Sequence, residues 1–366
     1  MLVLSVPVGE GHVAAARVLA ARMRALWPAA HVREVEGTGR GGRDRLLRGS
    51  YAATLRWAPC LYGLGYDVLV ARPRMAEFFK SVAAARLGRA LAPLVAAERP
   101  DLVVSTYPMT SGGLAWLRRR GALPGRTVAV VTDVAVHPFW VWADVDETWT
   151  LLPASRDQAR AIAPAATVSV APPAVDPRFR PGDRAVARAA TGLAPGAFVV
   201  LVTGGSLGFG GLERVVDAVL DAGAQAVVLA GRNDRLRRRL LARGLPPGRL
   251  VVHGWTDRVP EHVTAADVVL TTAGGMIATE ALAAGRPVLF ATPVPGHGRA
   301  GAEMTAAAGL ALVCPTPADV TATVRRLLRE PGERDRVSAA AVEFGSTDLD
   351  AALRGLADRA GPSARP

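Results

Sequence analysis

Cysteine is scarce in this 366-residue sequence, which has only Cys60 and Cys314. The two are far apart and belong to no metal-ligand or redox motif, which argues against a disulfide framework. Arg or Pro interrupts every apolar run before the roughly 18 to 20 residues that a membrane span needs. The chain begins with the strand-like run MLVLSVPV rather than with the basic flank and apolar core of a secretory signal. We therefore expect a cytoplasmic protein whose contact with a membrane is peripheral.

Acidic residues are too few to balance the basic ones, and the formal net charge is +12. Residues 40–89 hold ten Lys or Arg against three acidic residues, a net +7. Such a surface favours anionic partners, which could be nucleic acid, anionic lipid or a sugar diphosphate. The segment has no helix-turn-helix, zinc or RNP pattern, and its basic residues alternate with apolar ones, so we do not expect nucleic-acid binding.

Short runs rich in Val and Leu alternate with longer Ala, Leu and Arg segments at helical spacing, a pattern typical of βα units around a parallel sheet. Helices are expected, among others, over residues 81–98 and 212–222. The expected strands are LVLSV, DLVVST, RTVAVVTD, FVVLVTGG, QAVVLAG, RLVVHGW, DVVLTTA and PVLFAT. The sequence thus predicts an α/β protein with two doubly wound, Rossmann-like halves.

A proline-rich stretch, APPAVDPRFRPG, separates the two halves because it excludes regular structure. We place an N-terminal domain at residues 1–172, which includes the basic and aromatic segment 40–89, and a C-terminal domain at residues 173–345. A C-terminal helix and a loose tail would occupy residues 346–366.

Two polar groups are predicted at the edge of the N-terminal sheet. The first strand ends in Gly9-Glu10-Gly11-His12, so His12 would lie at a helix N-terminus, where a substrate can approach. A later strand delivers Asp133, with His137 shortly after it. These side chains suit general-base chemistry. The alternatives are that His12 only caps its helix and that Asp133 only caps its loop.

Two glycine-rich turns are predicted in the C-terminal half. Residues 204–210 read GGSLGFG, and residues 272–280 read TAGGMIATE, with Glu280 about one helical turn inside the next helix. Backbone amides and a helix N-terminus can neutralise a diphosphate, and the carboxylate can accept the hydroxyls of a ribose. Neither turn has the Gly-Lys-Ser/Thr ending of a Walker loop. The alternative is a tight turn followed by a solvated Glu.

The sequence Asp144-Val145-Asp146 has the form of a DxD metal motif, but it lies between Trp142 and Trp149 in an expected strand approach. We do not expect it to bind a metal. Helix termini can stabilise a leaving diphosphate without one, so no cofactor is predicted.

Several of these segments, in this order and spacing, resemble the monogalactosyldiacylglycerol synthase and processive diacylglycerol glucosyltransferase family, relatives of the peptidoglycan GlcNAc transferase. The matching segments span most of the chain. The resemblance implies a GT-B fold and transfer of a hexose or N-acetylhexosamine, with inversion, from a UDP-sugar to a hydroxyl of a lipid such as diacylglycerol. The segments are LSVPVGEGHVAAARVLA, YAATLRWAPCLYGLGYDVL, PDLVVSTYPM, VVTDVAVHPFWVWADVDETW, VDPRF, VTGGSLGFGG and TTAGGMIATEALAAGRPVLF.

The resemblance also implies a role for each matching position. His12, Asp133 and His137 would serve the acceptor hydroxyl. The donor would be bound by Gly205, Ser206, Gly208, Trp255, Thr256, Gly274, Gly275, Thr279, Glu280, Pro295, Gly296 and His297. The acceptor and an anionic membrane surface would be met by Gly11, Trp57, Leu61, Tyr62, Tyr66 and Arg72. The alternative for residues 51–70 is an amphipathic core helix.

One segment departs from the family pattern. The family usually carries Pro-Gly-Gln-Glu and then an Asn where this chain reads PGHGRAG over residues 295–301. The contacts to the sugar are therefore rewritten, and neither glucose nor galactose is assumed. Two other functions fit the sequence: a UDP-sugar 2-epimerase of similar fold, and a non-catalytic binder of nucleotide sugars or lipids.

Overall fold

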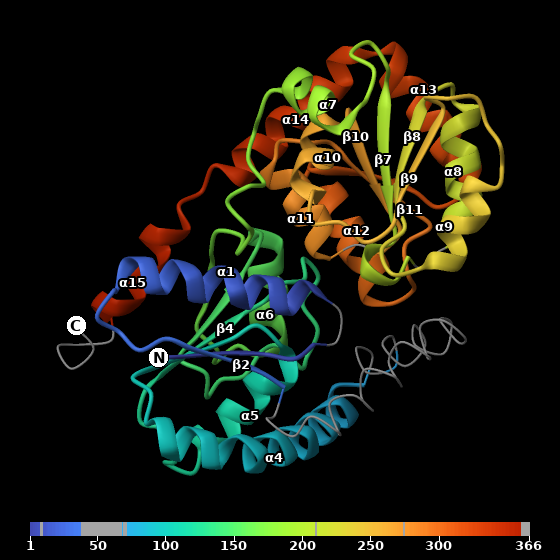
Figure 1. Ribbon diagram of the computed structural model, residues 1–366. Coiled ribbons are helices and arrows are strands. Elements are labelled where there is room, and N and C mark those ends of the chain that lie inside the picture. Colours follow the sequence, from blue (N-terminus) through green and yellow to red (C-terminus); the bar gives the residue numbers. More distant parts are fainter. Residues whose placement is uncertain (8–9, 38–67, 69–71, 209–210, 274, 360–366) are drawn as a thin grey trace. The chain divides into compact units, whose positions relative to one another are not determined.

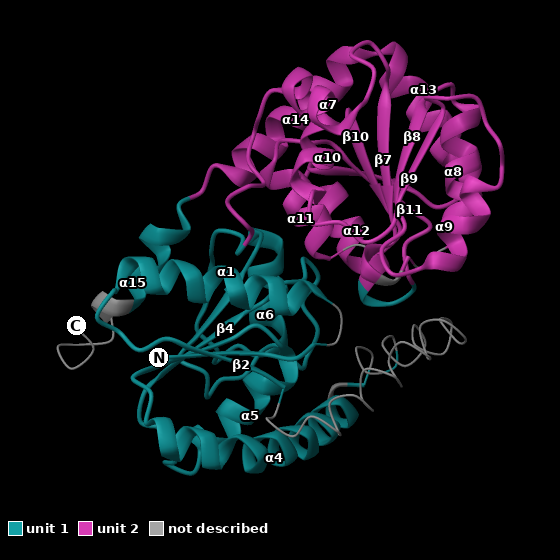
Figure 2. Cartoon of the chain, in the orientation of Figure 1, with its two compact units in different colours: residues 1–174, 295–297, 348–366 teal, residues 175–294, 298–347 magenta. Residues whose placement is uncertain are grey.

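The computed structural model describes residues 1–7, 10–37, 68, 72–208, 211–273 and 275–359. The chain forms two compact units (Figure 2). The first consists of Met1–Ala174, Pro295–His297 and Asp348–Pro366, and the second of Val175–Val294 and Gly298–Thr347. The end of the chain therefore returns to the first unit.

The first unit contains a six-stranded parallel sheet with the strand order β2-β1-β3-β4-β5-β6. The three central strands are apolar and buried on both faces, as expected of strands covered by helices. The strands are β1 (Leu2–Ser5), β2 (Arg33–Glu36), β3 (Leu102–Ser105), β4 (Arg126–Val130), β5 (Glu147–Thr150) and β6 (Val168–Val170). The helices are α1 (Glu10–Leu26), α4 (Pro73–Glu98), α5 (Pro108–Arg118), α6 (Pro153–Ile162) and α15 (Leu349–Arg359).

Two helix contacts organise this unit. Helices α4 and α5 approach closely at Gly88, where a Cβ would lie 2.4 Å from Cε3 of Trp116. Helix α15 packs against α1 (Figure 1), and Arg22 of α1 donates two hydrogen bonds, of 2.7 and 2.5 Å, to Asp350. The expected start of a helix at Ser81 is wrong, because α4 begins at Pro73, and proline is favoured in the first turn of a helix.

The second unit contains another six-stranded parallel sheet with the strand order β12-β11-β10-β7-β8-β9. The strands are β7 (Val199–Thr203), β8 (Gln225–Leu229), β9 (Leu250–His253), β10 (Val268–Thr271), β11 (Val288–Ala291) and β12 (Ala311–Cys314). The helices are α7 (Arg184–Thr191), α8 (Leu212–Asp221), α9 (Asp234–Leu241), α10 (Val259–Ala265), α11 (Met276–Ala283), α12 (His297–Ala307), α13 (Pro317–Arg329) and α14 (Pro331–Gly345), with a 3-10 turn at Gly205–Leu207.

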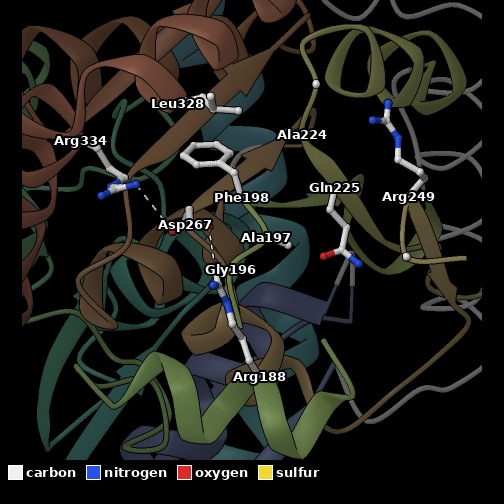
Figure 3. A pocket seen from close by; sticks show the side chains of 12 residues that line it. Arg188, Gly196, Ala197, Phe198, Ala224, Gln225, Arg249, Asp267, Leu328 and Arg334 are labelled. Atoms are coloured by element: carbon white, nitrogen blue, oxygen red, sulfur yellow. Dashed lines mark hydrogen bonds and ion pairs between the residues drawn. The ribbon is translucent and has the colours of Figure 1, made fainter. Parts of the chain in front are cut away.

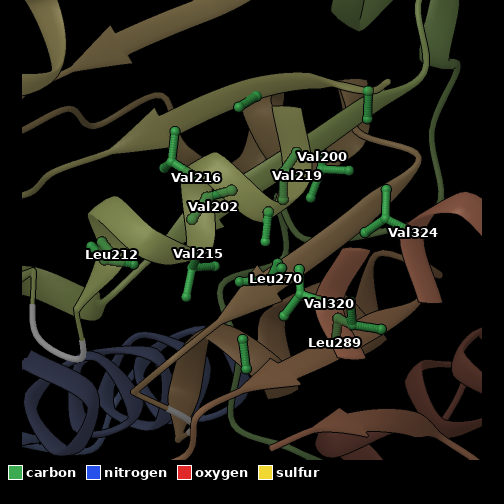
Figure 4. Close-up of a cluster of buried hydrophobic side chains, with 14 of the residues drawn as sticks. Val200, Val202, Leu212, Val215, Val216, Val219, Leu270, Leu289, Val320 and Val324 are labelled. Atoms are coloured by element: carbon green, nitrogen blue, oxygen red, sulfur yellow. The ribbon is translucent and has the colours of Figure 1, made fainter. Parts of the chain in front are cut away.

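The core of the second unit is a continuous layer of Val and Leu side chains between the sheet and its helices (Figure 4). Leu270 of β10 is fully buried in it, together with Val215 and Val216 of α8 and Val320 and Val324 of α13. Burying one such side chain contributes about 1.5–3 kcal/mol, so this layer supplies much of the stability of the unit.

Strand order reverses in both sheets, between β1 and β3 in the first unit and between β7 and β10 in the second. In open parallel sheets, ligands bind outside the carboxyl ends of the strands at such a point. A binding site is therefore expected after β1, β3 and β4 in the first unit. In the second unit it is expected after β7 and β10. No helix in the described ranges is both long enough and apolar enough to cross a bilayer.

Candidate active site

His12 lies in the first turn of α1, next to the carboxyl ends of β1, β3 and β4. Its Nδ1 lies 2.9 Å from Oγ1 of Thr132, the second residue after the end of β4. Thr106, at the end of β3, donates a hydrogen bond of 2.8 Å to the backbone carbonyl of His12. Two neighbouring strands thus hold both the ring and the backbone of His12.

Trp140 brings Asp133 and His137 next to His12. Its indole Nε1 donates a hydrogen bond of 3.1 Å to Oδ2 of Asp133. The Trp140 ring centroid is 6.0 Å from that of His12 and 6.2 Å from that of His137. Trp140 itself is fully buried. The structure therefore gathers the three residues expected to serve the acceptor around one indole ring.

Burial controls the charge of both histidines. It lowers the pKa of His12 and lowers that of His137 to about 4. The nearby Asp133 carboxylate raises both pKa values, but this effect is smaller than that of burial. Both rings are therefore neutral near pH 7. A neutral imidazole has one nitrogen that accepts a proton, and in His12 this is Nε2 when Nδ1–H donates to Thr132.

The two glycine turns of the second unit lie against each other. A Cβ on Gly205, in the turn after β7, would be 3.5 Å from Cβ of Ala273, in the turn after β10. Gly208 has φ of +61°, and a Cβ there would meet the carbonyl oxygen of Ala230 at 2.9 Å. Gly275 has φ of +63° and precedes α11, with open space where a Cβ would be. The turn before α11 can therefore admit a ligand to the helix N-terminus.

Glu280 lies one turn inside α11, and its carboxyl group has an unusual environment. Burial raises its pKa to about 7, with a further increase from the Asp176 carboxylate and an opposing effect of Arg178. Asp176 and Arg178 form an ion pair of 2.9 Å in the proline-rich stretch. The sequence analysis identified the segment VDPRF only through the family resemblance. It did not predict that Asp176 and Arg178 lie near Glu280. A half-buried carboxyl with a shifted pKa beside a glycine turn is typical of a binding site.

Trp255 presents an aromatic face after β9. Trp255 is 56% exposed, and the guanidinium carbon of Arg232 lies 3.8 Å from its ring centroid. The hydroxyl of the next residue, Thr256, accepts a hydrogen bond of 3.1 Å from the backbone N–H of Arg258. Trp255, which is expected to bind the donor, therefore presents an accessible ring.

Other predicted donor residues are placed by their elements. Thr279 is buried in α11, and Ser206 lies in the 3-10 turn, where its carbonyl accepts a hydrogen bond of 2.9 Å from the N–H of Arg232. Pro295, Gly296 and His297 group with the first unit, and His297 begins α12.

The structure describes only two of the residues predicted to meet the acceptor and the membrane. Gly11 lies in the first turn of α1, and Arg72 is an exposed residue that directly precedes α4. Gly274 of the donor group and four of the acceptor and membrane group lie outside the described residues: Trp57, Leu61, Tyr62 and Tyr66.

The DxD sequence is engaged by protein groups at the edge opposite to His12. Asp146 precedes β5, pairs with Arg118, and accepts hydrogen bonds of 2.7 Å from the N–H and the hydroxyl of Thr127. Asp144 pairs with Arg119 at 2.5 Å. Among the residues that the structure covers, no group of three or more His, Cys, Asp or Glu side chains could hold a metal ion.

Two protein-family models match the chain. Monogalactosyldiacylglycerol (MGDG) synthase matches residues 41–163, and Glycosyl transferases group 1 matches residues 200–330. A processive diacylglycerol beta-glucosyltransferase of Bacillus subtilis is 28% identical over 74% of this chain and 70% of its own length. The UDP-N-acetylglucosamine–N-acetylmuramyl-(pentapeptide) pyrophosphoryl-undecaprenol N-acetylglucosamine transferase of Streptomyces collinus is 34% identical over 47% of this chain and 50% of its own length.

Solved structures agree on the fold. Acinetobacter baumannii MurG, at 16% identity and a TM-score of 0.59, covers 98% of this chain with 99% of its own. Anabaena HepE, crystallised with UDP, has 15% identity, a TM-score of 0.59 and coverage of 98% of both chains. With its two parallel six-stranded sheets, the chain has the GT-B fold.

Proposed function

We propose that this chain, which belongs to the glycosyltransferase family of monogalactosyldiacylglycerol synthases and processive diacylglycerol glucosyltransferases, transfers a hexose or N-acetylhexosamine from a UDP-sugar to a hydroxyl of a lipid such as diacylglycerol. The observation that carries most weight is the arrangement in the second unit, where two adjacent glycine turns precede helices and the half-buried Glu280 lies one turn inside α11. That arrangement suits a nucleoside diphosphate.

The second unit would bind the donor through three kinds of contact. The amides and the positive end of the helix dipole at the start of α11 would meet the diphosphate. Glu280 would accept hydrogen bonds from the ribose hydroxyls, and the uracil ring would stack on Trp255. The residues 297–301, where the family's Gln, Glu and Asn are missing, leave the choice of hexose to experiment.

The first unit would serve the acceptor. As the acceptor oxygen forms a bond with the anomeric carbon, its proton passes to Nε2 of His12, and the bond between that carbon and the UDP oxygen breaks. The product has the inverted configuration, and UDP carries away the bonding electron pair. Asp133, held by Trp140, is the alternative proton acceptor and would also stabilise a protonated His12. In this scheme the α11 terminus stabilises the leaving UDP without a metal.

Peripheral contact with the cytoplasmic face of a membrane completes the proposal. Near the start of α4, Phe78, Phe79 and Val82 are 65%, 50% and 54% exposed, an unusual apolar group for a water-facing helix. Arg72 and Arg74 are exposed beside them and would meet anionic headgroups.

The test is a transfer assay with the purified full chain. Vesicles of phosphatidylglycerol containing diacylglycerol would be incubated with single UDP-sugars, and both UDP release and new glycolipids would be measured, the latter by mass spectrometry. We expect one donor to give a glycolipid. UDP binding without product from any donor would favour a non-catalytic binder, and conversion of a UDP-sugar to its C2 epimer without acceptor would favour the epimerase.

A further inference from the structure

A cavity of about 590 Å³ opens at the amino edge of the second sheet (Figure 3). Its walls come from residues at or just before the starts of four strands and from α7, α13 and α14. The lining includes the polar residues Arg188, Gln225, Arg249, Asp267 and Arg334, with Phe198 as an aromatic wall.

This cavity lies far from the donor turns within the same unit. All strands of the sheet run parallel, so the starts of β7 and β10 lie at one edge and the glycine turns that follow them at the other. A strand of five residues spans about 16 Å. A ligand in this cavity therefore would not compete with a UDP-sugar.

Asp267, directly before β10, is the only carboxylate among the described residues that line the cavity. It is buried, and it pairs with Arg184 and Arg188 at 2.6 Å each and with Arg334 at 3.8 Å. It also accepts a hydrogen bond of 2.8 Å from the N–H of Val199. One carboxylate thus faces three guanidinium groups.

A fourth arginine increases this imbalance. Arg286 is buried and interacts electrostatically with Arg184, Arg188 and Asp267. Burial together with the positive charge of Arg184 lowers its pKa to about 10. Asp335, which lies 3.6 Å from Arg334, is largely exposed, and water screens its charge. Arg188 and Arg286 are buried, and Arg334 is 19% exposed, whereas water partly solvates Arg184 at 33% exposure. Burying cations in excess of one carboxylate is costly unless a further anion balances them.

Several polar atoms around the cavity have no hydrogen-bond partner. Two of them belong to residues that line it: Nε of Arg334, which is a donor, and Oε1 of Gln225, which is an acceptor. Nε of Arg184 and Nε of Arg286 also lack a partner, but these two residues lie outside the lining. Gln225 is only 7% exposed and lines the cavity. A ligand that fits must accept hydrogen bonds from guanidinium groups and donate one to an amide oxygen.

We propose that this cavity is a second ligand site, which binds a phosphate group as monohydrogen phosphate or as a phosphate monoester. The phosphate oxygens would accept from the guanidinium group of Arg334, whose fork of donors matches a phosphate. A hydroxyl of the phosphate or of its organic part would donate to Gln225.

The experiment is calorimetric titration of the full chain with inorganic phosphate, at constant ionic strength and with UDP saturating the donor site. We expect saturable binding that weakens at least tenfold in Arg334→Gln and is unchanged in Arg235→Gln, which removes an exposed arginine of α9. Arg334 is partly exposed, so its variant should fold, and an unchanged UDP affinity would verify this.

Two further arms identify the source of the phosphate. Glycerol 3-phosphate and phosphatidic acid vesicles would be compared as competitors of inorganic phosphate, and competition by either supports the site. The proposal is overturned if phosphate does not bind saturably in the presence of UDP, or if Arg334→Gln binds it as well as the unchanged chain does. Neither result would affect the glycosyl transfer assay.

Discussion

Single residues of the candidate site owe their chemistry to burial. The same physical effect, loss of solvation, keeps the imidazoles of His12 and His137 neutral and keeps part of the Glu280 population protonated near pH 7. The neutral histidines can accept a proton. Because Glu280 is partly ionised near pH 7, its binding of a donor should depend on pH in this range.

Replacing His12 by alanine should lower kcat by about 10²- to 10⁴-fold, the usual contribution of a general base. Turnover would be followed as UDP release in the presence of the lipid acceptor. His31→Ala is the matched control because His31 is exposed on the segment before β2. Near-normal turnover in His12→Ala, combined with loss in Asp133→Asn, would transfer the role to Asp133.

Glu280 should make donor binding pH-dependent. Its carboxylate accepts the ribose hydroxyls better than its neutral form does, so with a pKa of about 7 the affinity for UDP-glucose should fall roughly tenfold from pH 8 to pH 6. UDP-glucose is the probe because the charge of its diphosphate is constant over this range. Glu280→Gln should bind more weakly at pH 8 and lose this dependence. The same slope in the variant would refute the assignment.

The effect of Glu280 on stability has a defined sign. Its pKa is higher in the folded chain than the ordinary value of 4.5, so the folded state binds more protons between pH 4.5 and about 7. The contribution of this group to the free energy of unfolding therefore decreases as the pH rises through that window and is constant above it.

Among the secondary-structure elements, α4 joins the core to the proposed membrane surface. Lys80 is buried on one side of it, where its ammonium group donates to the carbonyl oxygen of Val141 at 3.2 Å and lies 4.3 Å from the Trp142 ring centroid. Phe78 and Phe79 are exposed, with ring centroids 5.6 Å apart. One helix turn thus anchors the helix and presents two aromatic rings.

The double substitution Phe78→Ser with Phe79→Ser should reduce binding to phosphatidylglycerol vesicles by at least tenfold, because it removes apolar area that a bilayer would bury. Cosedimentation with vesicles would measure the effect. Val186→Ser, which changes an exposed apolar residue of α7, serves as the control. Thermal stability should be unchanged, and equal vesicle binding would contradict the proposed surface.

At the scale of the whole molecule, each unit has its own sheet and its own core, and this predicts two unfolding transitions. Leu270→Ala should cost about 2–5 kcal/mol in the second unit, and Leu114→Ala should cost a similar amount in the first. UDP should raise only the transition that Leu270→Ala lowers. Calorimetry of both variants, with and without UDP, would test this. One transition shifted equally by both substitutions would show that the units unfold together.

The apolar pattern of the sequence was sufficient for most of the fold. The eight strands expected from Val-rich and Leu-rich runs are β1, β3, β4 and β7 to β11, since buried parallel strands are continuous apolar runs. Three of the four that were not predicted, β2, β5 and β6, are polar or short, whereas β12 reads ALVC and is as long as β1. β2 reads REVE at a sheet edge, and β5 reads ETWT, in which the Glu147 carboxylate is buried by hydrogen bonds to Trp149 and Ser169. A polar side chain whose hydrogen-bond partners meet it only in the folded chain interrupts the apolar run by which a buried strand is predicted.

The sequence by itself determined the α/β class, the glycine turns and the positions of His12, Asp133 and Glu280, because local backbone needs and residue chemistry are written in short motifs. Only the tertiary structure decided what surrounds them. Trp140 links Asp133 to both histidines, and Asp176 lies near Glu280 although about a hundred residues separate them in the chain. The arginines around Asp267 likewise come from segments far apart in sequence. Burial and the charge of neighbours set pKa values and the need for a counter-ion, and both depend on contacts that form only when the chain folds.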